Sequence, residues 1–228
     1  NRDGWPDIYV SNDIAPNDVL YVNNGDGTFT DRAADWLDHT SFAGMGIDIA
    51  DFNNDGWPDI VQSDMMPPDL PDRKRVSGTS TTTALEALRT RGFFPQFNHN
   101  ALQLNRGPAP DGRMIFSEVG RMAGVAYTDW SWAALFADYD NDGRKDILIT
   151  NGYPKAVTDL DYQANSRMVM RLNDRRMSRL LAREMLDSLP GYQVTSHIFR
   201  NEGDLTFSDR SREWSLTETA FSYGAAYV

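Results

Sequence analysis

The sequence predicts an all-β fold built from repeated four-stranded antiparallel sheets, and three observations predict it. An acidic turn, D-x-[DN]-x-D-G-x-x-D, occurs in "DFNNDGWPDI" (51–60) and "DYDNDGRKDI" (138–147), and its later part opens the chain in "NRDGWPDI" (1–8). A hairpin motif of three mostly apolar residues, Asn, a Gly-containing turn and Phe also occurs three times. The phenylalanine that closes the hairpin motif lies 22 residues before the first aspartate of the next acidic turn in both cases, from Phe29 to Asp51 and from Phe116 to Asp138. Repetition of two motifs at a constant spacing indicates stacked structural repeats.

Each repeat is expected to contain four strands in the same order. In the middle repeat, "GIDIADF" alternates in hydrophobicity as strand one, and "DIVQS" follows the acidic loop as strand two. "LQLN" and "MIFSEV" then form strands three and four around the hairpin turn. Four antiparallel strands in each unit are typical of β-propeller blades. We therefore predict a propeller segment over residues 1–228, with repeats at about 1–50, 51–137 and 138–228.

Two long insertions separate strands two and three, at 64–100 and 151–195. The antiparallel order places these insertions at the end of each unit opposite the acidic loops and hairpins. The first insertion is expected to be an ordered loop with a flexible middle at "SGTSTTT" (77–83) and a short helical stretch after it. The second is expected to be one helix over about 159–189.

An arginine stripe with a four-residue period marks the second insertion. Its side chains are expected either to form a solvated helix face that pairs with the acidic sheets, or to be a docking surface for an anionic partner or glycan. Met168, Leu172, Leu180 and Leu189 are expected on roughly one side of the same helix. The stripe consists of Arg167, Arg171, Arg175, Arg179 and Arg183.

Composition excludes several classes of protein. The chain has 228 residues, 40% of them hydrophobic, which is too apolar for a disordered acidic tail. Its formal net charge of −11 argues against a nucleic-acid surface. Cysteine is absent, so disulfides, thiolate metal sites and cysteine nucleophiles are excluded. No apolar run approaches the roughly 20 residues that span a bilayer, so we expect no transmembrane segment.

The acidic turns are candidate metal sites because they crowd carboxylates together. Two unit charges about 4 Å apart repel by roughly 4 kcal/mol at an effective dielectric constant of 20. Calcium prefers six to eight oxygen ligands, which alternating Asp and Asn side chains can supply around a tight Gly turn. The turns are not EF-hands, since position twelve is Gln62 or Ile149 rather than glutamate. An Asx-rich turn without metal is the alternative interpretation.

We predict two complete Ca²⁺ sites and one site that lacks its first ligand. The loop at 138–146 offers four carboxylates against three at 51–59, so it is expected to bind Ca²⁺ more tightly. Each site combines side-chain oxygens with one backbone carbonyl. The predicted ligands are Asp51, Asn53, Asp55 and Asp59 with the Trp57 carbonyl; Asp138, Asp140, Asp142 and Asp146 with the Arg144 carbonyl; and Asn1, Asp3 and Asp7 with the Trp5 carbonyl.

Three stretches carry a resemblance to a known family: "VSNDIAPNDVLYVNNGDGTFTD", "GMGIDIADFNNDGWPDI" and "TDWSWAALFADYDNDGRKDI". They resemble FG-GAP/VCBS-type repeats, the blades of integrin α-subunit propellers, and are most similar to bacterial propellers related to cartilage acidic protein. The resemblance implies seven blades, Ca²⁺ in the loops between strands one and two, an extracellular, cell-surface or periplasmic location, and a role in adhesion or ligand binding. Three blades do not close such a ring, so the remaining blades of the same propeller are an expected partner.

A binding or scaffolding role is therefore expected, with a protein or glycan ligand on the face opposite the calcium loops. Polar, proline-containing clusters follow strand two there, at 11–18, 63–69 and 150–159, either as ligand contacts or as strand caps. Trp130 and Trp132 are expected in the core rather than as carbohydrate platforms. None of the histidines, at 39, 99 and 197, lies in a nucleophile motif, so no enzyme activity is expected. The alternative is a polysaccharide-processing enzyme such as a lyase, with candidates His99, Tyr127 and Tyr153.

Overall fold

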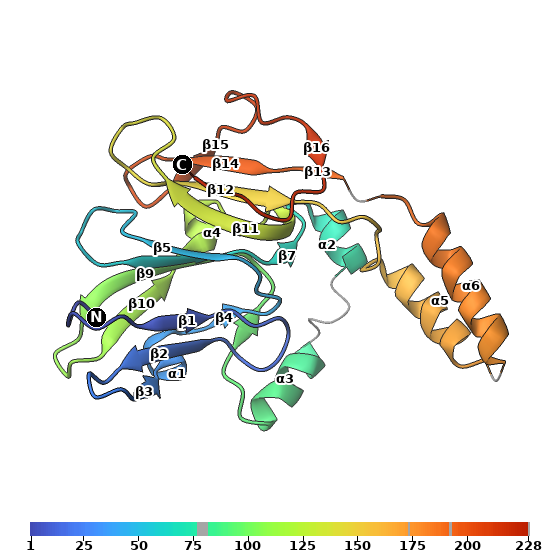
Figure 1. Cartoon of the computed structure of the whole chain (residues 1–228), viewed down its shortest axis with the longest axis horizontal. Coiled ribbons are helices and arrows are strands. Elements are labelled where there is room, and N and C mark those ends of the chain that lie inside the picture. Colours follow the sequence, from blue (N-terminus) through green and yellow to red (C-terminus); the bar gives the residue numbers. More distant parts are fainter. Residues whose placement is uncertain (77–81, 173, 192, 228) are drawn as a thin grey trace.

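A computed structural model of the chain describes residues 1–76, 82–172, 174–191 and 193–227. The described chain is mostly strands with some helices, and its strands form several small, mainly antiparallel sheets. Three of these sheets are stacked on one another in sequence order (Figure 1).

The four strands expected in each complete repeat are present and pair in the expected antiparallel order. The second sheet has the order β10-β9-β6-β5, and the third has the order β15-β14-β12-β11 with the short strand β7 beside β11. The first sheet has the order β1-β2-β3. The strands are β1 (Ile8–Val10), β2 (Val19–Asn23), β3 (Phe29–Asp31), β5 (Ile47–Ala50), β6 (Asp59–Gln62), β7 (Met65–Met66), β9 (Ala101–Pro108), β10 (Met114–Glu118), β11 (Asp129–Ala137), β12 (Asp146–Asn151), β14 (His197–Asn201) and β15 (Phe207–Asp209).

Two hydrophobic cores fill the spaces between the three sheets. Side chains alternate between the two faces of a strand, so Ile60 and Val61, adjacent in β6, contribute to different cores. The core between the first two sheets contains Tyr9, Leu20 and Phe116 with Ile60. The core between the second and third sheets contains Phe52, Phe136 and Ile147 with Val61, and the rings of Phe52 and Phe136 stack 6.1 Å apart. Each sheet therefore depends on its neighbour to bury its apolar face.

The second and third sheets approach most closely along their first strands, β5 and β11. The Gly46 N–H donates to the Trp132 carbonyl at 2.7 Å, and the Phe136 N–H donates to Asp48 Oδ2 at 2.8 Å. A Cβ atom on residue 46 would lie 2.4 Å from the Trp132 carbonyl oxygen, so only glycine fits. The first strands of neighbouring repeats thus lie side by side.

Several short elements were not expected from the sequence. Helices α1 (Ala33–Trp36) and α4 (Gly120–Ala123) each follow the last strand of a repeat and bury one alanine, Ala33 or Ala123. They are too short to produce a recognisable helical period. Strands β4 (Thr40–Ser41) and β8 (Gln96–Phe97) form a parallel pair, and β13 (Val194–Thr195) pairs with β16 (Thr219–Ala220).

The insertions are helical and lie at the end of the molecule opposite the acidic loops (Figure 1). The first contains α2 (Leu70–Val76) and α3 (Thr82–Thr90); most of its predicted flexible middle, 77–81, lies outside the described residues. In the second, the prediction of one continuous helix is wrong. It forms a hairpin of α5 (Leu160–Met170) and α6 (Arg175–Ser188). The Asp174 side chain accepts from the N–H groups of Arg176 and Met177, which starts a new helix after a turn.

The arginine stripe does not pair with the acidic sheets, so that expectation is wrong for the described residues. All five of its arginines are exposed, and among them the described structure gives an ion pair to Arg183 alone, with Asp187 of the same helix at 3.7 Å. The reason is geometric, because the hairpin projects away from the sheets (Figure 1). Helices α5 and α6 bury no residue, and Met168 and Met170 are 68% and 69% exposed. Among the described residues, no helix has the length and apolar character needed to cross a bilayer.

Candidate metal sites

The two complete acidic loops share one hydrogen-bond pattern. The first aspartate of each loop accepts two backbone N–H groups four and five residues later. Asp51 accepts from Asp55 at 3.1 Å and from Gly56 at 2.7 Å. Asp138 accepts from Asp142 at 3.0 Å and from Gly143 at 2.9 Å. The backbone of the turn therefore folds around the side chain of the first aspartate. The glycine, where the chain reverses, has φ near +90° in both loops.

Three carboxylates converge in the third-repeat loop. Asp138, Asp140 and Asp146 each offer an oxygen atom, and these atoms all lie within 4.8 Å of one another, so the cluster could hold a metal ion. In the other complete loop the corresponding residues are Asp51, Asn53 and Asp59. Hard carboxylate and amide oxygens suit a hard cation such as Ca²⁺. The donor set therefore fits the predicted ion at both loops, while ligation by the carbonyls of Trp5, Trp57 and Arg144 stays a prediction.

The fourth predicted side chain of each complete loop is placed differently. Asp142 lies outside the convergent group: its Oδ1 accepts from the Arg144 N–H at 2.9 Å and its Oδ2 faces arginine side chains. Asp55 makes the same turn contact, accepting from the Trp57 N–H at 2.8 Å. Because each carboxylate faces its own turn, it would have to rotate to complete its site.

The closing aspartate of each loop is buried and joins two strands. Asp59 accepts from the N–H groups of Phe52 at 3.0 Å and Asn105 at 2.8 Å, across the loop and across the sheet. Asp146 accepts in the same way from Tyr139 and Asn201, at 3.0 and 2.9 Å. These bonds tie the acidic loop to the Asn of the hairpin motif. They explain why the two motifs occur together in the sequence.

Burial makes the closing aspartate difficult to ionise without a cation. Desolvation, reinforced by the nearby carboxylates of Asp55 and Asp51, raises the pKa of Asp59 to about 7. Desolvation, with the charges of Asp140 and Asp142, also raises the pKa of Asp146. A divalent cation in either loop would favour the ionised form.

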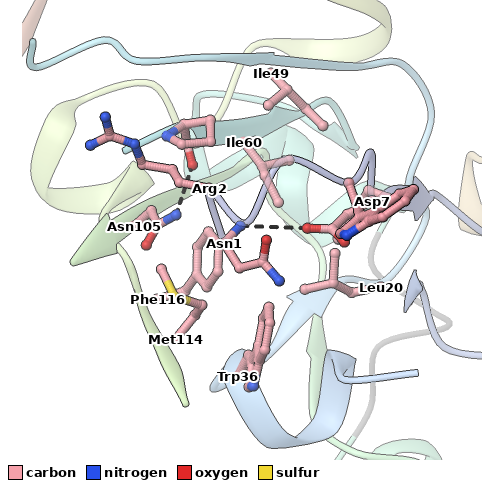
Figure 2. A pocket seen from close by; sticks show the side chains of 13 residues that line it. Asn1, Arg2, Asp7, Leu20, Trp36, Ile49, Ile60, Asn105, Met114 and Phe116 are labelled. Atoms are coloured by element: carbon pink, nitrogen blue, oxygen red, sulfur yellow. Dashed lines mark hydrogen bonds and ion pairs between the residues drawn. The ribbon is translucent and has the colours of Figure 1, made fainter. Parts of the chain in front are cut away.

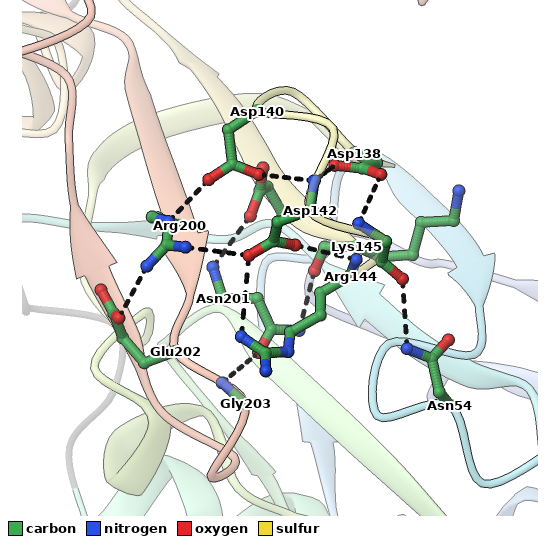
Figure 3. Close-up of polar contacts among 12 residues, drawn as sticks. Asn54, Asp138, Asp140, Asp142, Arg144, Lys145, Arg200, Asn201, Glu202 and Gly203 are labelled. Atoms are coloured by element: carbon green, nitrogen blue, oxygen red, sulfur yellow. Dashed lines mark hydrogen bonds and ion pairs between the residues drawn. The ribbon is translucent and has the colours of Figure 1, made fainter.

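Arg200 is a residue of this candidate site that the sequence analysis missed (Figure 3). Its guanidinium group contacts Asp140 Oδ2 at 2.6 Å, Asp142 Oδ2 at 2.9 Å and Glu202 Oε2 at 3.0 Å. The side-chain hydrogen bond from Arg200 lowers the pKa of Asp140. Arg144 Nη1 also lies 3.6 Å from Asp142 Oδ2. These two guanidinium groups would compete with a metal ion and offset the charge of the fourth carboxylate. The carboxylate count alone therefore does not decide which loop binds Ca²⁺ more tightly.

The partial loop at the start of the chain brings its predicted side chains together. The Asn1 amide donates to Asp3 Oδ2 at 2.8 Å, and the α-amino group lies 3.4 Å from Asp7 Oδ2. The other oxygen of Asp7 accepts from the Asn23 N–H at 2.9 Å, as in the complete loops.

A cavity of about 280 Å³ lies beside this partial loop, between the first and second sheets (Figure 2). Apolar side chains such as Leu20, Trp36 and Ile60 line most of it, and Arg2 and Asp7 are its charged groups.

At the opposite end, two aspartates of the polar clusters after strand two act as caps. Asp64 is fully buried and accepts from the N–H groups of Phe42 and Ala43 at 3.0 and 3.1 Å. Asp18 is also buried, and its Oδ2 accepts from the Tyr9 hydroxyl at 2.8 Å. These contacts hold the strand ends in place, and they remove both carboxylates from the ligand-accessible surface.

The two tryptophans were expected in the core, but both are half-buried and belong to neither hydrophobic core; they pack against other aromatic rings. Tyr153 stacks on Trp130 with ring centroids 4.1 Å apart and lies 6.0 Å from Trp132. Trp132 Nε1 donates to the Gly152 carbonyl at 2.7 Å. A role of either ring in carbohydrate binding stays an alternative.

Comparison with known proteins supports the resemblance seen in the sequence. Residues 1–61 match an FG-GAP-like repeat, so the chain carries a repeat of this class. The chain is 48% identical over 56 residues to cartilage acidic protein 1 of Homo sapiens, and 46% identical over the same length to the proteins of that name from Xenopus tropicalis and Mus musculus. Each match covers 24% of this chain and 8% of the relative. The homology to cartilage acidic protein 1 is thus partial.

Proposed function

We propose that the chain is a calcium-stabilised β-propeller segment that acts outside the cytoplasm as a binding or scaffolding module. The observation that carries this proposal is the repeated tie between an acidic loop and its hairpin, seen at Asp59–Asn105 and at Asp146–Asn201. A cation at such a loop links two strands of one sheet. The side-by-side first strands β5 and β11 are the arrangement that blades adopt around a propeller axis.

Calcium binding is tested by calorimetry and thermal unfolding in Ca²⁺ and in EDTA. A ligand at 100 times its Kd stabilises the folded state by about 2.7 kcal/mol per site. For a chain of this size, that corresponds to roughly 5–10 °C in Tm per site. Asp51→Asn and Asp138→Asn should each remove one binding event. Identical unfolding curves in Ca²⁺ and EDTA, with no heat of binding, would refute the calcium part of the proposal.

The helical end opposite the acidic loops is the proposed partner surface. Exposed arginines and exposed methionines of the α5–α6 hairpin suit an anionic protein or glycan with some apolar surface. A glycan array and a panel of extracellular proteins provide the screen. Replacement of Arg171, Arg175 and Arg179 by glutamate should abolish binding of any partner found. Arg113→Glu, which changes an exposed arginine at the acidic-loop end, is the matched control.

The alternative, a polysaccharide-processing enzyme, has limited support in the geometry. His99 and Tyr127 lie together, with ring centroids 6.3 Å apart, and Arg73 stacks on Tyr127 at 3.6 Å. Tyr153 belongs instead to the tryptophan stack. Turnover of an acidic polysaccharide that is lost in Tyr127→Phe would replace the binding proposal by this one.

A further inference from the structure

A second set of metal-ligating side chains lies at the end of the second sheet opposite the acidic loops. His39, His99 and Glu118 each offer one ligand atom, and the three atoms lie within 4.8 Å of one another. The Nε2 atoms of His39 and His99 are 3.6 and 4.0 Å from Glu118 Oε2. Two imidazoles and one carboxylate form a different donor set from the all-oxygen acidic loops.

Two of the three ligands are oriented by contacts on their far side. His99 is 1% exposed, and its Nδ1 lies 2.8 Å from the Asn100 carbonyl oxygen, which fixes the proton on Nδ1 and leaves the Nε2 lone pair free. Glu118 Oε1 accepts from the N–H groups of Leu102 and Gly120, at 3.0 and 2.6 Å. Glu118 Oε2 is therefore the oxygen that faces both histidines.

The third ligand has a polar atom without a partner. His39 Nε2 is shielded from solvent and makes no hydrogen bond among the described residues, since its 3.6 Å separation from Glu118 is too long for one. The ring itself is held edge-on against Phe97, with centroids 4.9 Å apart. A buried nitrogen that lacks a partner calls for an explanation, and a bound ion supplies one.

The distances suit a metal ion better than a hydrogen-bonded triad. Ligands about 2.0–2.1 Å from zinc at tetrahedral angles lie about 3.3 Å apart. The observed 3.6 and 4.0 Å require only a small contraction. A pocket of about 120 Å³, lined by the three ligand residues together with Phe97 and Arg121, lies at the cluster and leaves room for a further ligand.

We propose that His39, His99 and Glu118 form a site for a divalent first-row transition metal, with Zn²⁺ as the best match, separate from the calcium loops. Two imidazole nitrogens and one carboxylate are typical of zinc and related ions rather than of calcium. The three protein ligands leave one coordination position open toward the pocket.

The test is a Zn²⁺ titration of the full chain in excess Ca²⁺, which keeps the acidic loops filled. Calorimetry should give one Zn²⁺ per chain. Loss of one ligand in His39→Gln or in Glu118→Gln should weaken binding at least about 100-fold. Gln at position 118 retains an oxygen that can accept from Leu102 and Gly120, so the local fold is preserved. His197→Gln is the matched control, because His197 lies on the third sheet and pairs with Asp209 at 2.8 Å.

Co²⁺ provides a second readout, since its visible absorption reports nitrogen and oxygen coordination directly. The wild-type protein and His197→Gln should develop the same spectrum, and the two ligand variants should not. Circular dichroism in Ca²⁺ should show that all variants are folded. The proposal would be overturned if the wild-type protein bound no Zn²⁺ while Ca²⁺ fills the acidic loops, or if His39→Gln and Glu118→Gln bound Zn²⁺ as tightly as the wild type. Neither result would affect the proposed calcium-dependent function.

Discussion

The aspartates of one acidic loop have two different tasks at the residue scale. Asp59 is buried and satisfies two backbone N–H groups, whereas Asp55 is exposed and contacts its own turn. The first residue holds the strands together, and the second is available to a cation. The sequence motif alone does not distinguish these two roles, because it has aspartate at both positions.

Asp59→Ala and Asp55→Ala should therefore separate stability from calcium binding. Asp59→Ala leaves the N–H groups of Phe52 and Asn105 without a partner and should lower the metal-free free energy of unfolding by about 2–4 kcal/mol. Asp55→Ala should change it by less than about 0.5 kcal/mol but weaken Ca²⁺ binding. Urea unfolding in EDTA measures the first effect and calorimetry the second. Equal metal-free stability of the two variants would contradict this division of tasks.

Calcium binding at the 51–59 loop should depend on pH through Asp59. The pKa of this residue in the folded, metal-free protein is about 7, above its ordinary value of 3.8. Below pH 7, Ca²⁺ must displace a proton, so affinity should fall up to about tenfold per pH unit. The stability of the metal-free protein in EDTA should change in the opposite direction. Because the pKa of Asp59 is higher in the folded than in the unfolded state, folding stability is lost as pH rises from about 4 to 7.

This prediction is checked by Tm measurements between pH 5 and 8 with and without Ca²⁺. The metal-free Tm should decline toward neutral pH, and the Ca²⁺-dependent increment should grow over the same interval. Asp59→Asn removes the titrating group and should flatten the decline. A Ca²⁺ increment that is constant across this range would count against the role assigned to Asp59.

Arg200 should weaken calcium binding at the 138–146 loop. Arg200→Leu copies Leu104, which occupies the corresponding position before the hairpin Asn in the second repeat. Its removal frees Asp140 and Asp142 and should raise Ca²⁺ affinity about two- to fivefold. Calorimetry in an Asp51→Asn background, which removes binding at the other complete loop, measures this effect. Arg210→Leu is the control, because Arg210 pairs with Glu202 and Glu213 outside the loop; an equal gain there would show a nonspecific charge effect.

At the scale of elements, the strands were predictable and the short connections were not. The alternation in 47–50 and the turn chemistry around Gly56 determine β5 and β6 locally, and the structure has both strands. The parallel pair β4–β8 joins residues 40–41 to 96–97, across most of the first insertion. No local pattern encodes such a pairing. This pair also brings His39 toward His99, which is why the His–Glu cluster was not found from the sequence.

The α5–α6 hairpin should be dispensable for the sheets. Its helices bury no residue and project from the sheets, and its base is held by Lys155, whose Nζ donates to the Leu189 carbonyl at 2.7 Å. Replacement of residues 159–189 by a short Gly/Ser linker should change Tm by less than about 4 °C, the effect of roughly 1 kcal/mol. Ca²⁺ binding should be unchanged. Loss of cooperative unfolding in this variant would show that the hairpin belongs to the folding unit.

At the scale of the whole molecule, stability depends on close contact between neighbouring sheets. Gly46→Ala places a methyl group 2.4 Å from the Trp132 carbonyl oxygen and 2.7 Å from Ala133 Cα. The backbones of β5 and β11 must separate, which should cost about 1–3 kcal/mol. Gly224→Ala is the control, since a Cβ there meets no atom within 4 Å. Denaturant unfolding of both variants in Ca²⁺ makes the comparison, and equal midpoints would contradict the close approach.

The sequence by itself determined the main strands of the stacked sheets, their order, the acidic loops and the end of the molecule at which the insertions lie. These features follow from local periodicity, turn chemistry and antiparallel geometry, which neighbouring residues encode. Only the tertiary structure decided that Arg200 contacts the carboxylates of the 138–146 loop. It also decided that the closing aspartates are buried and hydrogen-bond two strands, and that His39, His99 and Glu118 lie together. Each of these depends on residues distant in sequence that are brought together by pairing or packing, and a single sequence carries no local signal for such contacts.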